Sequence, residues 1–263
     1  MTARRIAVGL FLGFLLSAAT GARRWARYEH EMQNPAEDPP DAWEKTEFAF
    51  TRLRFRSYRD GYWRGHARWG TDANKSERQF MQGLRRLSRV HVRSVEEIVD
   101  IDSDDLYNWP WIYAVGIGDW TLSPSHAARL RQYFERGGFL VVDDFHGERE
   151  WAQFMDGIQR IFPNSTVIEL EDDASIFHTV FDLSKRYQVS GLQVVRGMPY
   201  ERGGIDPHWR AVVDAKGRVQ VGIFFNMDLG DAWEWADYPE YPEKYPALAY
   251  RLGLNYVIYA MTH

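Results

Sequence analysis

The stretch Gly137-Gly138-Phe139-Leu140-Val141-Val142-Asp143-Asp144 decides the fold of this chain. Its two glycines are typical of a helix end, and the apolar run after them predicts a strand covered on both faces, as in a parallel α/β sheet. The strand ends on two carboxylates. Sheets of this kind bind ligands beyond the carboxyl ends of their strands, so the stretch also predicts a functional edge at Asp143 and Asp144.

The neighbouring segments extend this pattern. Ser123-Pro124 is a strong helix start, because the Ser hydroxyl can cap the helix and a Pro at the first helical position loses no useful donor. The helix that begins there joins two apolar strands, so we expect a right-handed βαβ unit. A second helix and strand follow. The pattern predicts strands over 111–117, 139–142 and 167–170, and helices over 123–137 and 151–161.

The rest of the chain adds elements on both sides of this unit. Ala215-Lys216-Gly217 is typical of a hairpin turn between two more strands. The expected fold is therefore a three-layer α/β/α sandwich with a mostly parallel sheet and an added antiparallel hairpin. The further expected elements are strands over 48–55, 90–92, 211–214 and 219–225, a helix around 80–87, a closing helix over 247–259, and a long loop over 58–74.

The N-terminus bears on the compartment. Arg4 and Arg5 precede an apolar run over 6–19 and small residues follow, as in a secretory signal, but arginines after the run also fit an uncleaved anchor. We therefore expect an exported protein, periplasmic or anchored to the membrane by this segment; the alternative is a cytoplasmic protein with a hydrophobic anchor. The expected organisation is a signal peptide or membrane anchor over 1–22, a linker over 23–46 and a single α/β domain over 47–263.

Composition narrows the function classes. The 263 residues include no cysteine, which excludes thiol catalysis, disulfides and Cys-based zinc sites. The formal net charge is −5 at pH 7 and no nucleic-acid motif is present, so nucleic acid is not an expected partner. The 11 Trp, 14 Tyr and 15 Phe lie largely in loops, where they either pack the loops onto the sheet or face a ligand.

Polar clusters follow three predicted strands, at 116–120, 143–147 and 226–231. Parallel strand ends converge on one edge, so we expect these clusters to share a crevice, where carboxylates with a histidine can bind a hard divalent cation or act as acid and base. The competing interpretation is structural, with the aspartates capping helices and satisfying loop amides. The candidate ligand-binding residues are Asp119, Asp143, Asp144, His146, Asn226, Asp228, Asp231 and Trp233, and the cofactor that such residues suit is a divalent metal.

Trp233 begins an aromatic segment with proline spacers that continues to Tyr241. Two interpretations stay open. The segment could cover the crevice or stack a sugar ring, or it could pack as a strap that holds the C-terminal helix.

Six motifs stand out together: Trp69-Gly-Thr-Asp72, Tyr113-Ala-Val-Gly-Ile-Gly118, the segment from Leu130 to Asp144, Ile161-Phe-Pro163, Asn226-Met-Asp-Leu-Gly-Asp231 and Leu254-Asn-Tyr-Val-Ile-Tyr-Ala260. In combination they resemble the bacterial family known as domain of unknown function 4159, over roughly residues 47–262. The resemblance implies a flavodoxin-like fold of the class I glutamine amidotransferase group and an exported or membrane-anchored context. Such amidotransferases use a Cys after a central strand; the similar place here reads Asp143-Asp144-Phe145-His146-Gly147, so thiol amidotransfer is excluded and no reaction is implied.

These observations favour a binding module at the cell envelope, whose edge around Asp143, Asp144 and Asp228 binds a small polar ligand or a protein partner. The rival hypothesis is a hydrolase that uses Asp143, Asp144 and His146, with or without a metal. A third possibility is a purely structural module, which predicts no pocket at that edge. Whether the protein is an enzyme stays open at this point.

Overall fold

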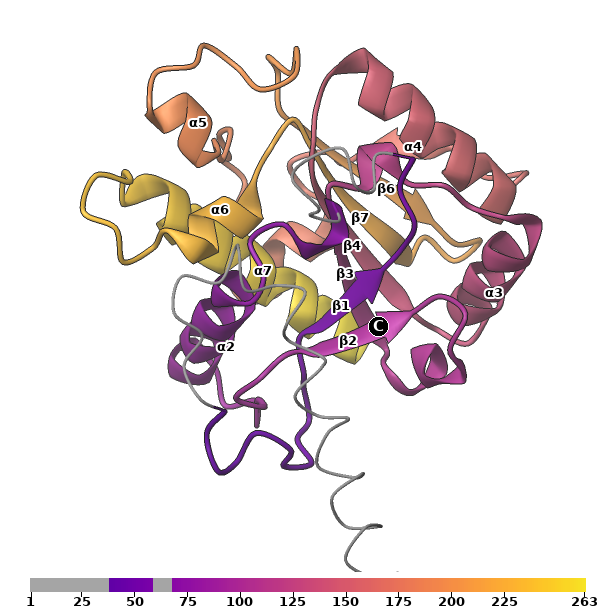
Figure 1. Cartoon of the computed structure of the whole chain (residues 1–263), viewed down its shortest axis with the longest axis horizontal. Coiled ribbons are helices and arrows are strands. Elements are labelled where there is room, and N and C mark those ends of the chain that lie inside the picture. Colours follow the sequence, from indigo (N-terminus) through magenta and orange to yellow (C-terminus); the bar gives the residue numbers. More distant parts are fainter. Residues whose placement is uncertain (1–37, 59–67) are drawn as a thin grey trace, which may run out of the picture.

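The computed structural model describes residues 38–58 and 68–263 (Figure 1). The expected signal or anchor segment, most of the expected linker and residues 59–67 of the expected loop lie outside the described residues. The described part contains a seven-stranded sheet with the order β2-β1-β3-β4-β7-β6-β5. The strands are β1 (Thr51–Arg54), β2 (Glu97–Asp100), β3 (Trp111–Val115), β4 (Phe139–Phe145), β5 (Val167–Glu169), β6 (His208–Val213) and β7 (Val219–Phe225).

The sheet is mostly parallel, as predicted. Strands β2, β1, β3, β4 and β7 run parallel to one another, whereas β6 pairs antiparallel with β7 and β5 antiparallel with β6. The predicted hairpin is thus present as β6 and β7. It joins the sheet through β7, which lies beside β4, so β4 occupies the centre and is buried along its whole length.

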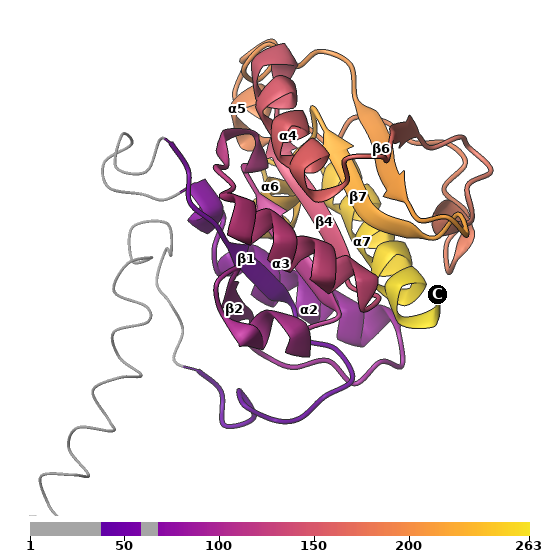
Figure 2. The same cartoon turned by 90° about the vertical axis from the view of Figure 1, so that its right-hand side faces the viewer.

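Helices cover both faces of the sheet and complete the predicted three-layer fold (Figures 1 and 2). Side chains alternate along β4: Leu140 and Val142 join the core on the side of α3 and α4, and Phe139 and Val141 join the core on the side of α2, α6 and α7. The helices are α2 (Lys75–Leu87), α3 (Pro124–Glu135), α4 (Gly147–Ile161), the short α5 (Leu192–Val195), α6 (Leu229–Glu234) and α7 (Lys244–Thr262).

The βαβ unit forms as the sequence predicts. The Ser123 hydroxyl accepts a hydrogen bond from the backbone N–H of His126, with Pro124 at the first helical position. After α3 the chain turns at Gly137, whose φ of 93° belongs to the left-handed region that glycine adopts without steric cost, and β4 begins two residues later.

Two strand predictions need correction. Residues 90–92 form no strand; Val92 makes an isolated bridge to Phe48, and the edge strand is β2, whose four residues have charged ends and too short an apolar pattern to be recognised. The strand after α4 is β5, but it pairs antiparallel with β6 at the far edge and is largely exposed. The predicted alternation of helices and parallel strands therefore ends at α4, and β7, not β5, pairs with β4.

Candidate functional site

Asp143 lies at the carboxyl end of the central strand and fixes the start of a helix. Its Oδ2 accepts hydrogen bonds from the backbone N–H groups of Leu229 (2.7 Å) and Gly230 (2.9 Å) and from the Tyr113 hydroxyl (2.9 Å). Its Oδ1 has no hydrogen-bond partner among the described residues. Burial and the neighbouring charge of Asp144 raise the pKa of Asp143 to about 7. The residue therefore anchors α6 and holds a proton near neutral pH.

Asp144 occupies the turn from β4 into α4 with a φ of 50°, a left-handed conformation that is unusual for a residue other than glycine. Its Oδ1 lies 2.5 Å from the Arg202 guanidinium and 3.2 Å from Nε2 of His146, and its Oδ2 lies 3.9 Å from Arg68. Burial alone would raise the pKa of Asp144, but Arg202 and the hydrogen bond to His146 hold it well below its usual range. This carboxylate is ionised and charge-balanced.

His146 is buried beside this pair. Its backbone N–H donates to Glu150 (2.8 Å), and its ring Nδ1 has no hydrogen-bond partner within the described chain. Burial lowers the pKa of His146, so the ring is neutral at pH 7. One potential ligand atom each from Asp144, His146 and Glu201 lie within 4.8 Å of one another. The arrangement could hold a metal, but the guanidinium of Arg202 already neutralises Asp144.

Asp119 joins the same edge from the next strand. It ends the 3-10 turn η3 (Ile117–Asp119) that follows β3 and is fully buried. Its carboxylate lies 3.3 Å from Arg149 and 3.6 Å from Arg68. Arg68 therefore lies between Asp119 and Asp144, and links the ends of β3 and β4.

The third predicted cluster begins with Asn226, which fastens two loops. Its side-chain Oδ1 accepts from the backbone N–H of Gly147 (2.9 Å), and its Nδ2 donates to the carbonyl of Asp206 (2.7 Å). Both ends of the amide are used inside the protein, so its role is structural.

Asp228 and Asp231 flank the first turn of α6. Asp228 caps the helix by accepting from the backbone N–H of Asp231 (2.7 Å), while Asp231 accepts from the N–H of Leu192 (2.6 Å) and from Nε1 of Trp235 (3.1 Å). Burial, followed for Asp228 by the charge of Asp231, raises the pKa of both carboxyls. Both interpretations of these aspartates apply. Their carboxylates accept hydrogen bonds from backbone N–H groups, as in the structural interpretation, and they also lie close to one another, as expected at a ligand site.

Gly191 shows where the carboxylates converge. A Cβ atom at this position would collide with oxygens of Glu201, Asp228 and Asp231, so these three groups close around one point. Glu201 Oε1 is buried without a hydrogen-bond partner in the described segments, and burial together with the charge of Asp144 raises the pKa of Glu201 to about 7. Asp231 is only half-buried and forms the exposed side of the group. The arrangement is a largely buried recess lined by carboxyl groups.

Asp72 extends this recess on the side of α2. It follows the 3-10 turn η1 (Arg68–Gly70), and its φ is 62°. Burial, then the charges of Asp231 and Glu234, raise its pKa well above the usual range. One oxygen from each of these three carboxylates lies within 4.8 Å of the others.

The edge thus has two halves with different charge balance. Around Asp144, the guanidinium groups of Arg68 and Arg202 neutralise the carboxylates. Asp228 and Asp231, in contrast, form no ion pair with a basic side chain among residues 38–58 and 68–263. The second half can accept a positively charged group from outside.

Trp233 lies in the hydrophobic core and not in an exposed loop. It belongs to α6, packs against Phe50, Phe80 and Tyr113, and lies close to Gly253 of α7. The reason is local: the caps supplied by Asp143 and Asp228 start a helix where an aromatic loop is expected, and that helix turns Trp233 inward. The placement agrees with the packing interpretation of this segment rather than with the covering one.

Sequence reasoning missed Asp72, Glu201, Glu234, Arg68 and Arg202. Asp72 was visible only as part of the Trp69–Asp72 motif, because it follows no predicted strand. Glu201 and Arg202 come from the irregular segment between α5 and β6, where nothing in the local pattern indicates which way a side chain points. Only the tertiary fold brings them to the edge.

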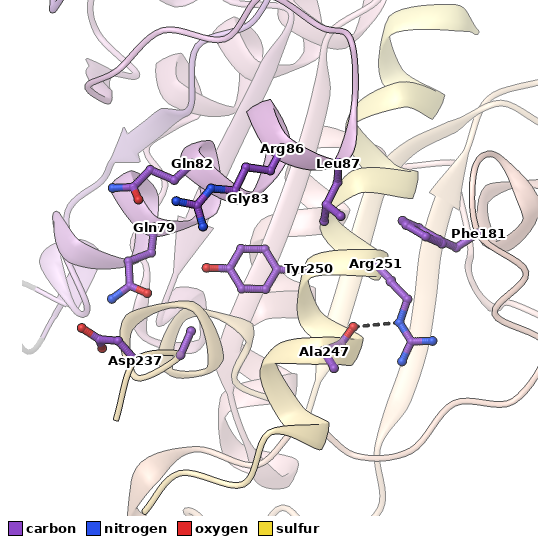
Figure 3. Close-up of a pocket in the computed structure, with 11 residues that line it drawn as sticks. Gln79, Gln82, Gly83, Arg86, Leu87, Phe181, Asp237, Ala247, Tyr250 and Arg251 are labelled. Carbon is purple, nitrogen blue, oxygen red and sulfur yellow. Dashed lines mark hydrogen bonds between the residues drawn. The ribbon is translucent and has the colours of Figure 1, made fainter. Parts of the chain in front are cut away.

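A second hollow lies between α2 and α7, with a volume of about 730 Å³ (Figure 3). The ring of Tyr250 lies in its middle against Gly83, and the guanidinium groups of Arg86 and Arg251 lie at its sides. In the described part of the chain neither arginine forms an ion pair; Arg251 donates to the carbonyl of Ala247 (2.8 Å). None of the candidate residues lines this hollow, which provides a control for the experiments below.

Comparison with known proteins identifies the family. None of the helices in the described residues is long and apolar enough to cross a membrane. No curated protein matches the sequence. A family model described as a domain of unknown function (DUF4159) matches residues 49–261, which span the whole sheet and all the named helices except the last residue of α7. The chain therefore belongs to the DUF4159 family.

Proposed function

We propose that this domain is a binding module that takes a small, positively charged polar ligand at the carboxyl edge of its sheet. The observation that carries the proposal is the convergence of Glu201, Asp228 and Asp231 around Gly191. Three carboxylates in one largely buried recess repel one another, and a cationic group removes that repulsion.

The hydrogen-bonding capacity of the recess supports the same ligand class. Glu201 Oε1 has no partner among the described residues, and a buried acceptor without a partner is unfavourable. An ammonium or guanidinium group supplies the missing donor to Oε1 and adds positive charge beside Asp228 and Asp231, whereas Oε2 of Glu201 already pairs with Arg202 at 3.4 Å. Asp231, which is half-buried, gives such a group a route from solvent.

Replacing Glu201 with Gln tests this proposal, because the change removes one charge and keeps the side-chain size. With ethanolamine, putrescine and arginine as probes, we expect calorimetry to detect binding of at least one to the wild type. Its affinity should fall by at least about tenfold in Glu201→Gln, since a hydrogen bond to a charged group contributes about 1.5–3 kcal/mol. The control Arg251→Ala lies in the other hollow and should bind as the wild type does. Loss in the control with retention in Glu201→Gln would place the ligand between α2 and α7 and refute the proposal.

We also propose that the module works at the cell envelope, exported or anchored by its N-terminal segment. The support is the pattern of Arg4 and Arg5 before an apolar run over 6–19. Fractionation of cells that express the full chain with a C-terminal tag should recover the tag from the membrane or exported fraction. Recovery from the cytoplasm alone would contradict this location.

A hydrolase is the second candidate, and the turn at Asp144 favours it. A non-glycine residue with a φ of 50° at a strand-to-helix turn is a strained feature of the kind that gathers at active sites, and His146 and Asp143, whose pKa burial raises to about 7, adjoin it. Turnover of ester or phosphoester probes by the wild type and its loss in His146→Gln would support this function. Ligand binding without turnover of any probe would leave the binding module.

A further inference from the structure

We propose that Asp72, Asp231 and Glu234 form a binding site for a hard divalent cation, Ca²⁺ or Mg²⁺. The three carboxylates come from two separate segments: Asp72 follows η1, and the other two belong to α6, beyond the end of β4 (Figure 1). One oxygen from each lies within 4.8 Å of the other two. Ligands at about 2.3–2.6 Å from one Ca²⁺ are separated by at most about 5 Å, so the three oxygens are close enough to share one ion.

An independent observation points to a missing partner at this place. Oδ2 of Asp72 is buried and has no hydrogen-bond partner among the described residues, although the whole residue is 7% exposed. This oxygen points at the first turn of α6, since a Cβ atom on Gly230 would collide with it. A buried carboxylate oxygen without a donor is unfavourable, and a cation is the partner that its position allows.

The surroundings of the three oxygens are suited to a metal ion. Asp231 is held on both oxygens, by the N–H of Leu192 and by Nε1 of Trp235, as ligating carboxylates usually are. The backbone of α6 is fixed by Asp143 through two hydrogen bonds, so Asp231 and Glu234 are carried on a rigid element. Among the described residues, Arg52 also lies near the cluster, but its guanidinium pairs with the buried Glu77.

The chemistry of the donor set selects the class of ion. All three donors are carboxylate oxygens, and the described cluster offers no imidazole or thiolate, which are the donors that Zn²⁺ and Cu²⁺ prefer. Oxygen-only sets suit Ca²⁺, Mg²⁺ and Mn²⁺. The site takes its remaining ligands from solvent through the half-buried side of Asp231.

This inference deepens the proposed function and rests on it in one respect, because both need the carboxylate edge to accept positive charge from outside. The two fail separately. Titration with the metal chloride alone tests the ion site, and titration with the organic amines tests the ligand site. Binding of an amine without any binding of metal leaves the proposed function standing and removes this inference.

The experiment uses the full chain after dialysis against EDTA, titrated calorimetrically with CaCl₂, MgCl₂ and ZnCl₂ in turn. We expect one ion per chain for Ca²⁺ or Mg²⁺, and a loss of affinity of at least tenfold in Asp72→Asn and in Glu234→Gln. The matched control is Asp237→Asn, an exposed carboxylate three residues after Glu234 that pairs with Lys75 outside the cluster; it should bind as the wild type does.

Two variants are used so that the misfolding of one does not decide the result. Asp72→Asn and Glu234→Gln alter different segments, and circular dichroism shows whether each variant is folded. Absence of Ca²⁺ and Mg²⁺ binding to the folded wild type overturns the inference. So does binding that both variants retain, or a preference for Zn²⁺ that only His146→Gln removes, which would assign the ion to Asp144, His146 and Glu201 instead.

Discussion

Replacing Arg52 with Met should lower the free energy of unfolding by about 3–5 kcal/mol, the usual cost of leaving one partner of a buried ion pair alone. Arg52 and Glu77 are both fully buried and paired. The guanidinium also donates to the carbonyls of Trp69 (2.9 Å) and Thr71 (2.7 Å) and to the Ser76 hydroxyl (3.3 Å). The substitution therefore leaves one buried carboxylate, one buried carbonyl and one half-buried carbonyl without their guanidinium partner. Urea unfolding followed by circular dichroism measures the loss.

The neighbouring strand residue Arg54 provides a matched control. It pairs with Asp100 on β2 through the same chemistry, but the two side chains are 36% and 40% exposed. Exposed pairs contribute about 0–1 kcal/mol, so Arg54→Met should cost far less than Arg52→Met. The double variant Arg52→Met/Glu77→Leu removes both buried charges and should recover part of the loss. Equal costs for the two single variants would contradict this account.

The Arg52 pair also matters for the site. Its carbonyl contacts hold the turn from Trp69 to Thr71, and Asp72 follows that turn directly. Arg52, a buried residue of β1, thereby positions the carboxylate of Asp72, which follows no predicted strand in the sequence. Arg52→Met should consequently weaken Ca²⁺ or Mg²⁺ binding as well as stability, provided the variant remains folded.

The central part of the fold was predictable because its signals are local. The apolar run over 139–142, the Ser123-Pro124 start and the Ala215-Lys216-Gly217 turn each specify their own element. Edge strands carry no such signal. β2 and β5 are four and three residues long, and β5 is mostly exposed, so their sequences need not be apolar. Their place in the sheet follows from pairing with distant strands, which no short pattern records.

The candidate site divides in the same way. Asp119, Asp143 and Asp144 were predictable because they follow apolar strands, and the ends of parallel strands share an edge. Glu201 and Asp72 reach the edge through irregular segments, and Trp233 turns inward because α6 forms. The pairing of charged side chains could not be predicted either. Only the tertiary structure shows that Arg202 neutralises Asp144, while Asp228 has no basic partner in the described chain.

Raising the pH from about 5 to about 8 should lower the free energy of unfolding by several kcal/mol, measured by urea unfolding in EDTA. Burial raises the pKa of Glu96, Asp143 and Glu201 to about 7, with the charges of Glu77 or Asp144 adding to the effect. The folded protein thus keeps protons that the unfolded chain releases near pH 4. Between these values the folded state binds more protons, so stability falls as pH rises, by about 3 kcal/mol for each such group.

Two other groups do not reverse this sign. Asp144, whose pKa is depressed, is ionised in both states above about pH 5 and contributes no slope there. His146, whose pKa burial lowers, favours folding as pH rises through about 6.5, but it is one group against several carboxyls with raised pKa values. Stability that stays constant or rises from pH 5 to pH 8 would show that the carboxyls are ionised in the folded protein at neutral pH.

Glu96→Gln distinguishes the pH dependence of stability that is due to Glu96 from that of the candidate site, because Glu96 lies beside Arg78 and away from the carboxyl edge of the sheet. Glutamine keeps the acceptor for the Arg78 Nε, 3.2 Å away, and removes the charge that burial and Glu77 oppose. The variant should match the wild type near pH 5 and exceed its stability by about 3 kcal/mol near pH 8, which flattens the pH profile by one group. The remaining slope then belongs to the carboxyls of the sheet edge whose pKa values are raised: Asp72, Asp143, Glu201, Asp228 and Asp231. An amine or a divalent ion that binds at the sheet edge should reduce this remaining pH dependence and leave the contribution of Glu96 unchanged. Such a result would show that the ligand neutralises the same negative charge that destabilises the folded protein at neutral pH.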